Sequence, residues 1–471
     1  MIDGIPDGPA HMTADEFRRH GHALIDWLAD YQENITDHPV LSQVKPGSVR
    51  AQLPDSAPET GEPFESLIAD LDEIVLPGIT HWQNPNWFAY FPANASPPSI
   101  LAELVSAGIG AQGMLWTTSP AVTEVETQVM DWLVELLGLP ETWLTTSAGG
   151  GVLQMSASDS THTALVVARH QMSKTGAAIE DMVAYTSSQA HSSIEKGSTV
   201  AGYGHVRLID VDENQAMRVD LLAYAIAADR AAGLTPVFIG SAVGTTATTG
   251  VDPIRAISEL IAGSDIWHHV DAAYAGTAMI CPEFRHHQDG LEMVDSYTFN
   301  PHKWMMVNFD CSAFYVADRA PLIDCLSILP PYLKNEASET GAVIDYRDWH
   351  VPLGRRFRSL KLWWVLRTYG AQGIRAMVRH HVALTEWLAA KLEADPRFEL
   401  VAPHPFALVC FRCVAGDDAT NGLATAVNNT GEVFWTPSTL EGKSMIRVSI
   451  GQTHTGPAEI ENLWSLIDEL G

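Results

Sequence analysis

Apolar positions near the start of the chain recur with the spacing of an amphipathic helix. Thr13-Ala-Asp-Glu16 has the pattern of a helix capping box, and Phe17, Leu24, Trp27 and Tyr31 follow at helical intervals. Residues 45–65 are rich in Pro, Ser, Asp and Gly, which predicts a loop. We therefore expect residues 1–84 to form a helical segment whose apolar face packs on a partner surface.

From Trp87 to about Val351 the pattern changes to short apolar runs that alternate with helical stretches. This alternation predicts an α/β fold, in which helices flank a mostly parallel central sheet, and we assign it to a large domain over residues 85–360. Ligands of such sheets gather beyond the carboxyl ends of the strands. The expected strands are 182–186, 206–209, 236–240, 266–270 and 312–316.

The last quarter of the chain has a third pattern. A long helical run passes through Trp363 and Met377, and from Phe398 apolar and polar residues alternate as they do in antiparallel strands. Residues 460–470 again have helical spacing. A small C-terminal α+β domain is expected over residues 361–471.

Composition narrows the range of partners. The chain has 471 residues, and 28 Lys and Arg against 57 Asp and Glu give a net charge of −29, which disfavours nucleic acid and anionic membranes as partners. No apolar run is long enough to span a bilayer, and the first residues lack the pattern of a secretory signal. Five scattered cysteines are typical of reduced thiols. We expect a cytoplasmic protein.

Lys303 stands in the run Asn300-Pro-His-Lys-Trp304 and is followed by Met305, Met306 and Val307. These neighbours predict that its amine enters an apolar interior, where desolvation favours the neutral form that attacks a carbonyl. A lysine can also extend its amine to the surface, and this pentapeptide alone weights the two readings about equally.

Asp271 lies at the end of a predicted strand, in His269-Val-Asp-Ala-Ala-Tyr-Ala-Gly276. A carboxylate there could hold a heterocyclic nitrogen protonated, and the small residues after it would let a flat ring approach. A strand-end aspartate alone is more often a turn former or a helix cap. Its position 32 residues before Lys303 favours a shared site.

Further polar residues have a possible role at this site. The Gly-rich stretch from Ser147 to Ser158 reads as a loop before a helix and could bind phosphate, although it matches neither common nucleotide motif. His191 follows a predicted strand and could stack on a ring or act in acid–base chemistry. Thr245 and Thr246 could donate a hydrogen bond to a ring substituent, although ordinary β-propensity is the favoured explanation when they are taken alone.

Metal binding is not predicted. The pairs His268-His269, His286-His287 and His380-His381 are adjacent in sequence, so their side chains diverge on a helix or a strand. Cys410 and Cys413 lie three apart in a strand-like run, which points them to opposite faces.

Longer motifs give the chain a family resemblance. NPHKW followed by VNFDCSA, together with HVDAAYAG, ICPEFRH, QAHSS and PLGRRFRSLK, resembles the group II pyridoxal-phosphate-dependent decarboxylases and, within them, the aromatic-L-amino-acid decarboxylase branch. The resemblance is dense from Trp82 to Arg358 and looser in the tail. It implies a fold-type I enzyme that binds pyridoxal 5′-phosphate (PLP) and forms a homodimer with active sites at the subunit interface.

The resemblance also implies roles for single residues. Lys303 would form the internal aldimine, Asp271 would pair with the pyridine nitrogen, and His191 would stack on the ring. Tyr332, in Pro330-Pro-Tyr-Leu-Lys334, matches the family's donor of a proton to Cα of the quinonoid intermediate. Further cofactor positions are Ala157, Ser158 and Asn300 at the phosphate, His302 beside them, Thr246 near the ring and Ala273 on the face opposite His191.

The implied reaction converts an aromatic L-amino acid to the arylalkylamine and CO2. Its substrate would be tryptophan, 5-hydroxytryptophan, phenylalanine, tyrosine or 3,4-dihydroxyphenylalanine. Gly354 matches a position where glycine accompanies indolic substrates in plant relatives, whereas Ala93, Gln112 and Met114 depart from the animal enzymes and leave the ring preference open. The full set of implied substrate positions is Trp82, Tyr90, Phe91, Pro92, Ala93, Gln112, Met114 and Gly354.

Three alternatives remain at this point. One is a group II decarboxylase for a non-aromatic amino acid such as glutamate or diaminobutyrate, and another is an aromatic aldehyde synthase. A catalytically silent cofactor-binding dimer is the third. Tyr332 and His191 are the residues that aldehyde-forming relatives replace, so their presence favours the decarboxylase.

Overall fold

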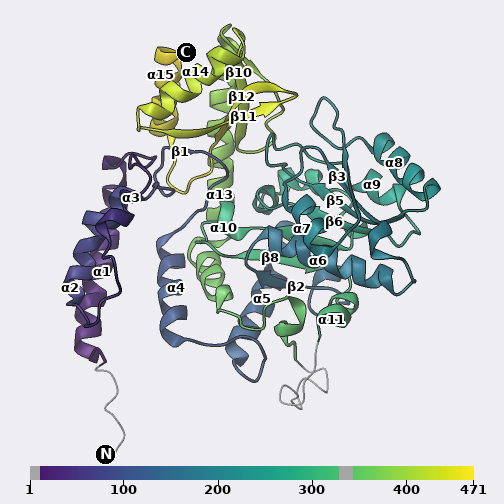
Figure 1. Ribbon diagram of the computed structural model, residues 1–471, viewed down its shortest axis with the longest axis horizontal. Coiled ribbons are helices and arrows are strands. Elements are labelled where there is room, and N and C mark those ends of the chain that lie inside the picture. The colour runs from purple at the N-terminus through teal and green to yellow at the C-terminus, as the bar shows by residue number, and fades with distance from the viewer. Residues whose placement is uncertain (1–10, 328–342) are drawn as a thin grey trace, which may run out of the picture.

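A seven-stranded sheet forms the centre of the computed structural model, which describes residues 11–327 and 343–471 (Figure 1). The strand order is β2-β8-β7-β6-β5-β3-β4. β8 is antiparallel to both of its neighbours, and the other pairs are parallel. The strands are β2 (Gly150–Gln154), β3 (Met182–Ser187), β4 (His205–Ile209), β5 (Thr235–Ala242), β6 (Trp267–Asp271), β7 (Ser296–Phe299) and β8 (Ser312–Val316).

The five strands expected from the sequence are all present, and the α/β class is confirmed. One expectation was wrong: residues 150–154 were read as part of a Gly-rich loop but form the fully buried strand β2. Glycine is depleted in strands, so local propensity does not predict β2. Its pairing with β8, which is distant in sequence, stabilises it as a strand. β7 was not expected either, because it is short and contains polar residues.

Helices cover both faces of this sheet, as the alternating pattern predicts (Figure 1). Val152 and Leu153 of β2 point into different apolar clusters, which lie on opposite faces. One face carries α6 (Ala157–Ser173), α7 (Ser193–Ala201) and α11 (Ala320–Leu326), and the other carries α5 (Pro120–Leu137), α8 (Val219–Ala231) and α9 (Ile254–Leu260).

The C-terminal part forms a second sheet, with the order β1-β11-β12-β10-β9. Its tail strands pair antiparallel, as their alternation predicts, but its edge strand β1 comes from residues 87–88, which we had grouped with the large domain. The long helix α13 (Arg358–Ala394) connects the two sheets and is interrupted at Gly370, where φ is 62°. The other elements are β1 (Trp87–Phe88), β9 (Phe398–Leu400), β10 (Leu408–Cys413), β11 (Phe434–Leu440), β12 (Lys443–Ser449), α14 (Asp417–Asn429) and α15 (Pro457–Leu470).

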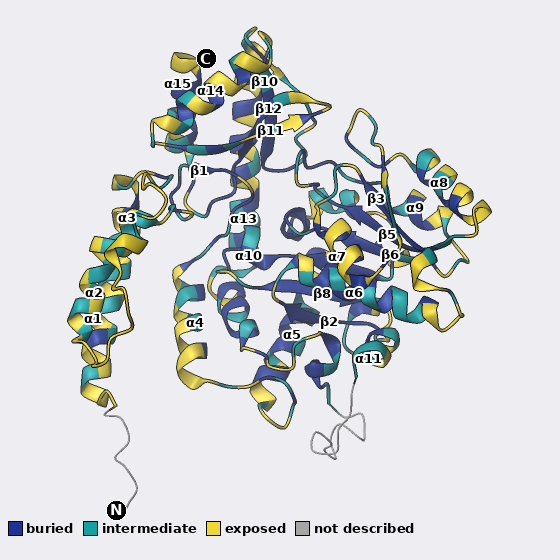
Figure 2. Ribbon diagram, in the orientation of Figure 1, coloured by how far each residue is buried: buried dark blue, intermediate teal, exposed yellow. Residues whose placement is uncertain are grey.

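The N-terminal helices project from the body as an arm and are largely exposed (Figures 1 and 2). The predicted capping box is present: the Thr13 hydroxyl accepts a hydrogen bond from the Glu16 amide, and the Glu16 carboxylate accepts one from the Thr13 amide. No helix in the described part of the chain combines the length and apolar character needed to cross a membrane. The arm contains α1 (Ala14–Glu33), α2 (Phe64–Asp70) and α3 (Leu76–Gly78), and α4 (Pro97–Ile109) follows it.

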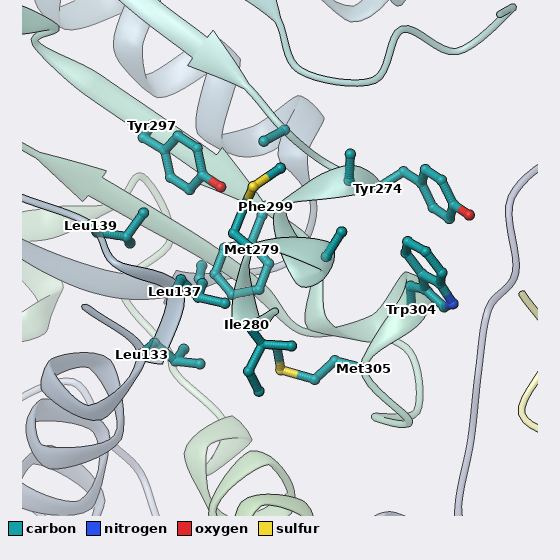
Figure 3. Packing of buried hydrophobic residues seen from close by; sticks show 14 of the residues in the cluster. Leu133, Leu137, Leu139, Tyr274, Met279, Ile280, Tyr297, Phe299, Trp304 and Met305 are labelled. Carbon is teal, nitrogen blue, oxygen red and sulfur yellow. The ribbon is translucent and has the colours of Figure 1, made fainter. Parts of the chain in front are cut away.

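A stack of aromatic rings anchors the segment that carries Lys303. Tyr274 stacks on Phe91 at 4.0 Å and on Trp304 at 4.7 Å between ring centroids, and Figure 3 shows Tyr274 beside Trp304. The Trp304 indole donates a hydrogen bond to His381 of α13. Because Trp304 is fully buried, the short helix α10 (Pro301–Trp304) has a fixed position on the core.

Candidate active site

A cavity of about 210 Å³ opens beyond the carboxyl ends of the parallel strands. His191 follows β3, Thr246 follows β5, Asp271 ends β6 and Asn300 follows β7. Since parallel strands end at the same edge of a sheet, these residues converge although they are far apart in sequence. All of the proposed cofactor positions line the cavity, namely Ala157, Ser158, His191, Thr246, Asp271, Ala273, Asn300, His302 and Lys303.

Lys303 presents its amine to this cavity. Its Nζ lies 5.3 Å from the centroid of the Phe91 ring. Burial lowers the pKa of Lys303, Asp271 opposes that shift, and Arg447 adds to it. The neutral amine, which is the nucleophilic form, is thereby favoured.

Asp271 and His191 provide the charged and the aromatic group near this amine. The Asp271 carboxylate accepts a hydrogen bond of 2.8 Å from the Ala273 amide, which orients it. The His191 Nδ1 accepts one of 3.1 Å from the Ser193 amide. Desolvation lowers the pKa of His191, Asp271 raises it and Lys303 lowers it, so the ring is neutral at neutral pH.

The N-terminus of α6 also lines the cavity. Ser156 caps the helix by accepting from the Asp159 amide, and the amides of Ala157 and Ser158 belong to the first turn, where no acceptor exists within the helix. Such amides and the helix dipole favour a bound anion. His302 accepts from the Cys311 amide, and burial lowers its pKa to about 3, so it is neutral.

These groups fit PLP. The Lys303 amine matches the cofactor aldehyde, the Asp271 carboxylate matches the pyridine nitrogen, and the start of α6 matches the phosphate. Asn300 lines the cavity, and its side-chain oxygen is buried without a hydrogen-bond partner among the described residues. Burying a polar atom without a hydrogen bond costs free energy, and a ligand that donates a hydrogen bond to this oxygen would remove that cost.

Two further residues, Arg447 and Phe309, contact the site and were not proposed from the sequence. Arg447 of β12 is buried, donates hydrogen bonds to the carbonyl oxygens of Thr246 and Ala247, and lies 5.5 Å from the Phe91 ring centroid. Nothing in the local pattern indicates this contact, because it joins the second sheet to the first. Phe309 packs edge-on against His302 at 4.6 Å. The cavity is also lined by Ser156, Ala242, Gly244, Thr245 and Tyr274.

Of the proposed substrate positions, Phe91 lines the cavity and the others lie elsewhere in the single chain. Trp82 stacks on Tyr90 at 5.7 Å, and Tyr90 is half exposed. Pro92 lies against Gly451, and the Ala93 carbonyl accepts a hydrogen bond from Gln83.

Gln112, Met114 and Gly354 lie together, away from the cavity lining. The Gln112 side chain accepts from the Arg355 amide, and the Met114 carbonyl accepts from the Arg347 amide. A Cβ atom at Gly354 would lie 3.5 Å from the Gln112 Nε2 atom. Tyr332 lies outside the described residues.

Four of the five cysteines are buried, and Cys325 is partly buried. All five cysteines are free, and Cys410 and Cys413 face different apolar clusters across β10. Across residues 11–327 and 343–471, no group of three or more His, Cys, Asp or Glu side chains has the arrangement of a metal site.

Known proteins resemble this chain over nearly its whole length. Residues 46–414 match the family described as the pyridoxal-dependent decarboxylase conserved domain. Phenylacetaldehyde synthase of Arabidopsis thaliana is 43% identical and covers 97% of this chain and 96% of its own length. Tryptophan decarboxylase 2 of Oryza sativa subsp. japonica is also 43% identical and covers 97% of this chain and 94% of its own length.

A solved structure extends the likeness to three dimensions. The crystal structure of Oryza sativa TDC with PLP and tryptamine superposes with a TM-score of 0.96 at 37% identity and covers 98% of this chain and 99% of its own. The expected fold-type I architecture and cofactor are thus confirmed. The chain belongs to the pyridoxal-dependent decarboxylase family, and its cofactor is pyridoxal 5′-phosphate.

Proposed function

We propose that this PLP enzyme decarboxylates an aromatic L-amino acid to the arylalkylamine and CO2. The observation that carries the proposal is the convergence of Lys303, Asp271, His191 and the start of α6 on one cavity. Bound PLP supplies the electron sink for the electron pair that remains when CO2 leaves. The similarity to a tryptophan decarboxylase supports an aromatic substrate.

Each residue of the site has a proposed task. The neutral Lys303 amine attaches the cofactor and is displaced by the substrate amine. Asp271 keeps the pyridine nitrogen protonated, and His191 and Ala273 enclose the ring from its two faces. The first turn of α6 and Asn300 hold the phosphate, with His302 and Thr246 beside them. Tyr332 donates the proton that replaces the carboxylate on Cα.

An indolic substrate is the first choice. Glycine at position 354 accompanies indolic substrates in plant relatives, and the Oryza sativa structure contains tryptamine. The positions outside the cavity of the single chain are proposed to contact substrate in the dimer, namely Trp82, Tyr90, Pro92, Ala93, Gln112, Met114 and Gly354.

We therefore propose a homodimer with residues 1–84 as its dimerisation arm, 85–360 as the cofactor domain and 361–471 as the small domain. Exposed apolar side chains on α1 and α4 support this proposal, because a single soluble chain seldom leaves such groups in water: Phe17 is 66% exposed, Leu104 53% and Ile109 63%. Five free cysteines support a reducing, cytoplasmic location.

An aromatic aldehyde synthase is the second candidate, because phenylacetaldehyde synthase is among the close relatives. Such an enzyme releases ammonia and hydrogen peroxide along with CO2. The purified enzyme should be incubated with tryptophan, 5-hydroxytryptophan, phenylalanine, tyrosine and 3,4-dihydroxyphenylalanine. For at least one of these amino acids we expect the enzyme to form one mole of amine per mole of CO2. Tryptophan should react fastest.

The Lys303→Ala variant should lose both this activity and the visible absorbance of the lysine-bound cofactor. Tyr332→Phe should keep the absorbance but divert product toward aldehyde. Release of peroxide equal to CO2 by the unchanged enzyme would establish the aldehyde synthase instead. Amine formation only from glutamate or diaminobutyrate would refute the aromatic assignment.

A further inference from the structure

A buried polar network joins the underside of α6 to the strand that carries Asp271. His269 lies two residues before Asp271 on β6, so both side chains point to the α6 face of the sheet. His269 Nε2 lies 3.3 Å from the Thr161 hydroxyl of α6, and Nδ1 lies 2.8 Å from the Ser296 hydroxyl of β7. Thr161, Ser296 and His269 are all fully buried.

The direction of these hydrogen bonds follows from their partners. The indole of Trp267 donates to Ser296 Oγ at 2.8 Å, which leaves the Ser296 hydroxyl proton free to bond to His269 Nδ1. In that arrangement His269 Nε2 carries the ring proton and donates a hydrogen bond to Thr161. Burial lowers the pKa of His269 to about 3, which keeps the ring neutral, with one donor and one acceptor nitrogen, over the physiological range.

The contact between α6 and the sheet is polar over its first two turns. Ser160, Thr161 and Thr163 are fully buried, and the Ser160 hydroxyl lies 3.4 Å from that of Ser312 on β8. Apolar packing is non-directional and lets a helix slide by small amounts, whereas hydrogen bonds fix both distance and angle. Directional contacts thus add to the apolar packing of α6 and constrain its position over β6.

This position matters because the two elements hold opposite ends of one ligand. Thr161 is one turn beyond Ala157, at the phosphate end, and His269 is two residues before Asp271, at the ring end. We propose that His269 is a positioning residue that fixes the spacing between the phosphate site on α6 and the pyridine site on β6. The inference rests on the proposed function of Ala157, Ser158 and Asp271.

Three probes separate this role from a general loss of structure. PLP engages both ends of the site, pyridoxal engages only the ring end, and inorganic phosphate engages only the start of α6. A wrong spacing lowers the affinity for PLP, which must bind at both ends at once. It leaves the affinities for pyridoxal and for phosphate unchanged, because each binds at one end only. Dissociation constants are measured with the full-length enzyme after removal of its cofactor.

The His269→Phe variant keeps an aromatic ring but loses both hydrogen bonds. We expect it to weaken PLP binding about 10-fold while pyridoxal and phosphate stay within about 2-fold of the unchanged enzyme. Thr161→Val replaces threonine with a side chain of nearly the same shape and should likewise weaken the binding of PLP alone. It replaces His269→Phe in the test if that variant does not fold.

His268 provides the matched control. It is adjacent on β6, equally buried and bonded to the hydroxyls of Ser241 and Ser258, but it points to the opposite face. His268→Phe should lower stability without changing the ratio of PLP to pyridoxal affinity. An unchanged ratio in His269→Phe or Thr161→Val, or an equal fall in His268→Phe, would overturn the inference. An unchanged enzyme that binds pyridoxal as tightly as PLP would instead refute the proposed phosphate site.

Discussion

At the scale of single residues, Lys303 shows how surroundings determine chemistry. Its pentapeptide is compatible with a surface amine as well as with a buried one, and the structure places the amine near Phe91, Asp271 and Arg447. Burial is the largest cause of its lowered pKa, and the positive charge of Arg447 contributes in the same direction. Arg447 thus affects the reactivity of a residue 144 positions earlier in the chain.

Arg447→Met should raise the pKa of Lys303. Loss of a nearby positive charge makes the ammonium form less costly, so a higher pH is needed to obtain the neutral amine. The rate of PLP uptake by the cofactor-free enzyme, measured against pH, should shift its midpoint upward by about 1 unit. Arg412 lies on β10, the strand beside β12, and forms an ion pair with Glu399. The control variant Arg412→Met should leave the midpoint unchanged. A downward shift in the Arg447 variant would contradict this account.

At the scale of elements, β2 shows the limit of local patterns. By sequence, the glycines before and within β2 resemble those of a phosphate-binding loop. In both cases glycine lets another group, either a ligand or a protein backbone, come close to the chain. The structure shows that the approach is to protein: a Cβ atom at Gly149 would lie 2.3 Å from the Val316 carbonyl oxygen and 2.6 Å from that of Thr142. The glycines therefore serve packing, and the proposed phosphate positions begin at Ala157.

Gly149→Ala should destabilise the fold by about 3 kcal/mol, because the Val316 carbonyl belongs to β8, which pairs with β2, and the Thr142 carbonyl accepts a hydrogen bond from the Gly149 amide, so neither can move freely. Gly422 in α14 has no atom within 4 Å of the position of a Cβ, so Gly422→Ala should stabilise by up to about 1 kcal/mol. The urea midpoints of both variants are compared with that of the unchanged enzyme. A Gly149→Ala variant of unchanged stability with weakened phosphate binding would restore the loop interpretation.

At the scale of the whole molecule, buried neutral histidines connect the fold to pH. Burial lowers the pKa to about 3 for five histidines on β6, α10, α13 and the segment before α13, namely His268, His269, His302, His350 and His381. Burial acts in the opposite direction on Asp252 and Asp295, whose pKa rises to about 6.

Stability should fall steeply as the pH drops from 6.5 toward 4. In that range each unfolded histidine takes up a proton that its folded form refuses, so acid favours the unfolded chain by up to about 1.4 kcal/mol per pH unit and histidine. The two aspartates oppose the trend, because below pH 6 they bind protons in the folded state. Urea midpoints of the holoenzyme at pH 6.5, 5.5 and 4.5 should decrease in that order. Constant or rising midpoints would show that the histidines do not dominate.

The sequence by itself determined the class of fold and the kind of site. Five central strands and the N-terminal cap could be read from it because their signals are local: runs of apolar residues, alternation, and a capping box at Thr13. The motifs around Lys303 and Asp271 likewise indicated PLP, because a chemical task requires particular residue types at fixed places.

Only the tertiary structure decided what depends on contacts between distant segments. It turned residues 150–154 into a strand, attached residues 87–88 to the C-terminal sheet, brought Arg447 beside Phe91 and placed Trp82, Gln112 and Gly354 outside the cavity lining. It also joined α6 to β6 through a contact between Thr161 and His269, beside the apolar packing of α6 on the sheet. Such features depend on packing between residues far apart in the chain, which the sequence pattern around each residue does not contain.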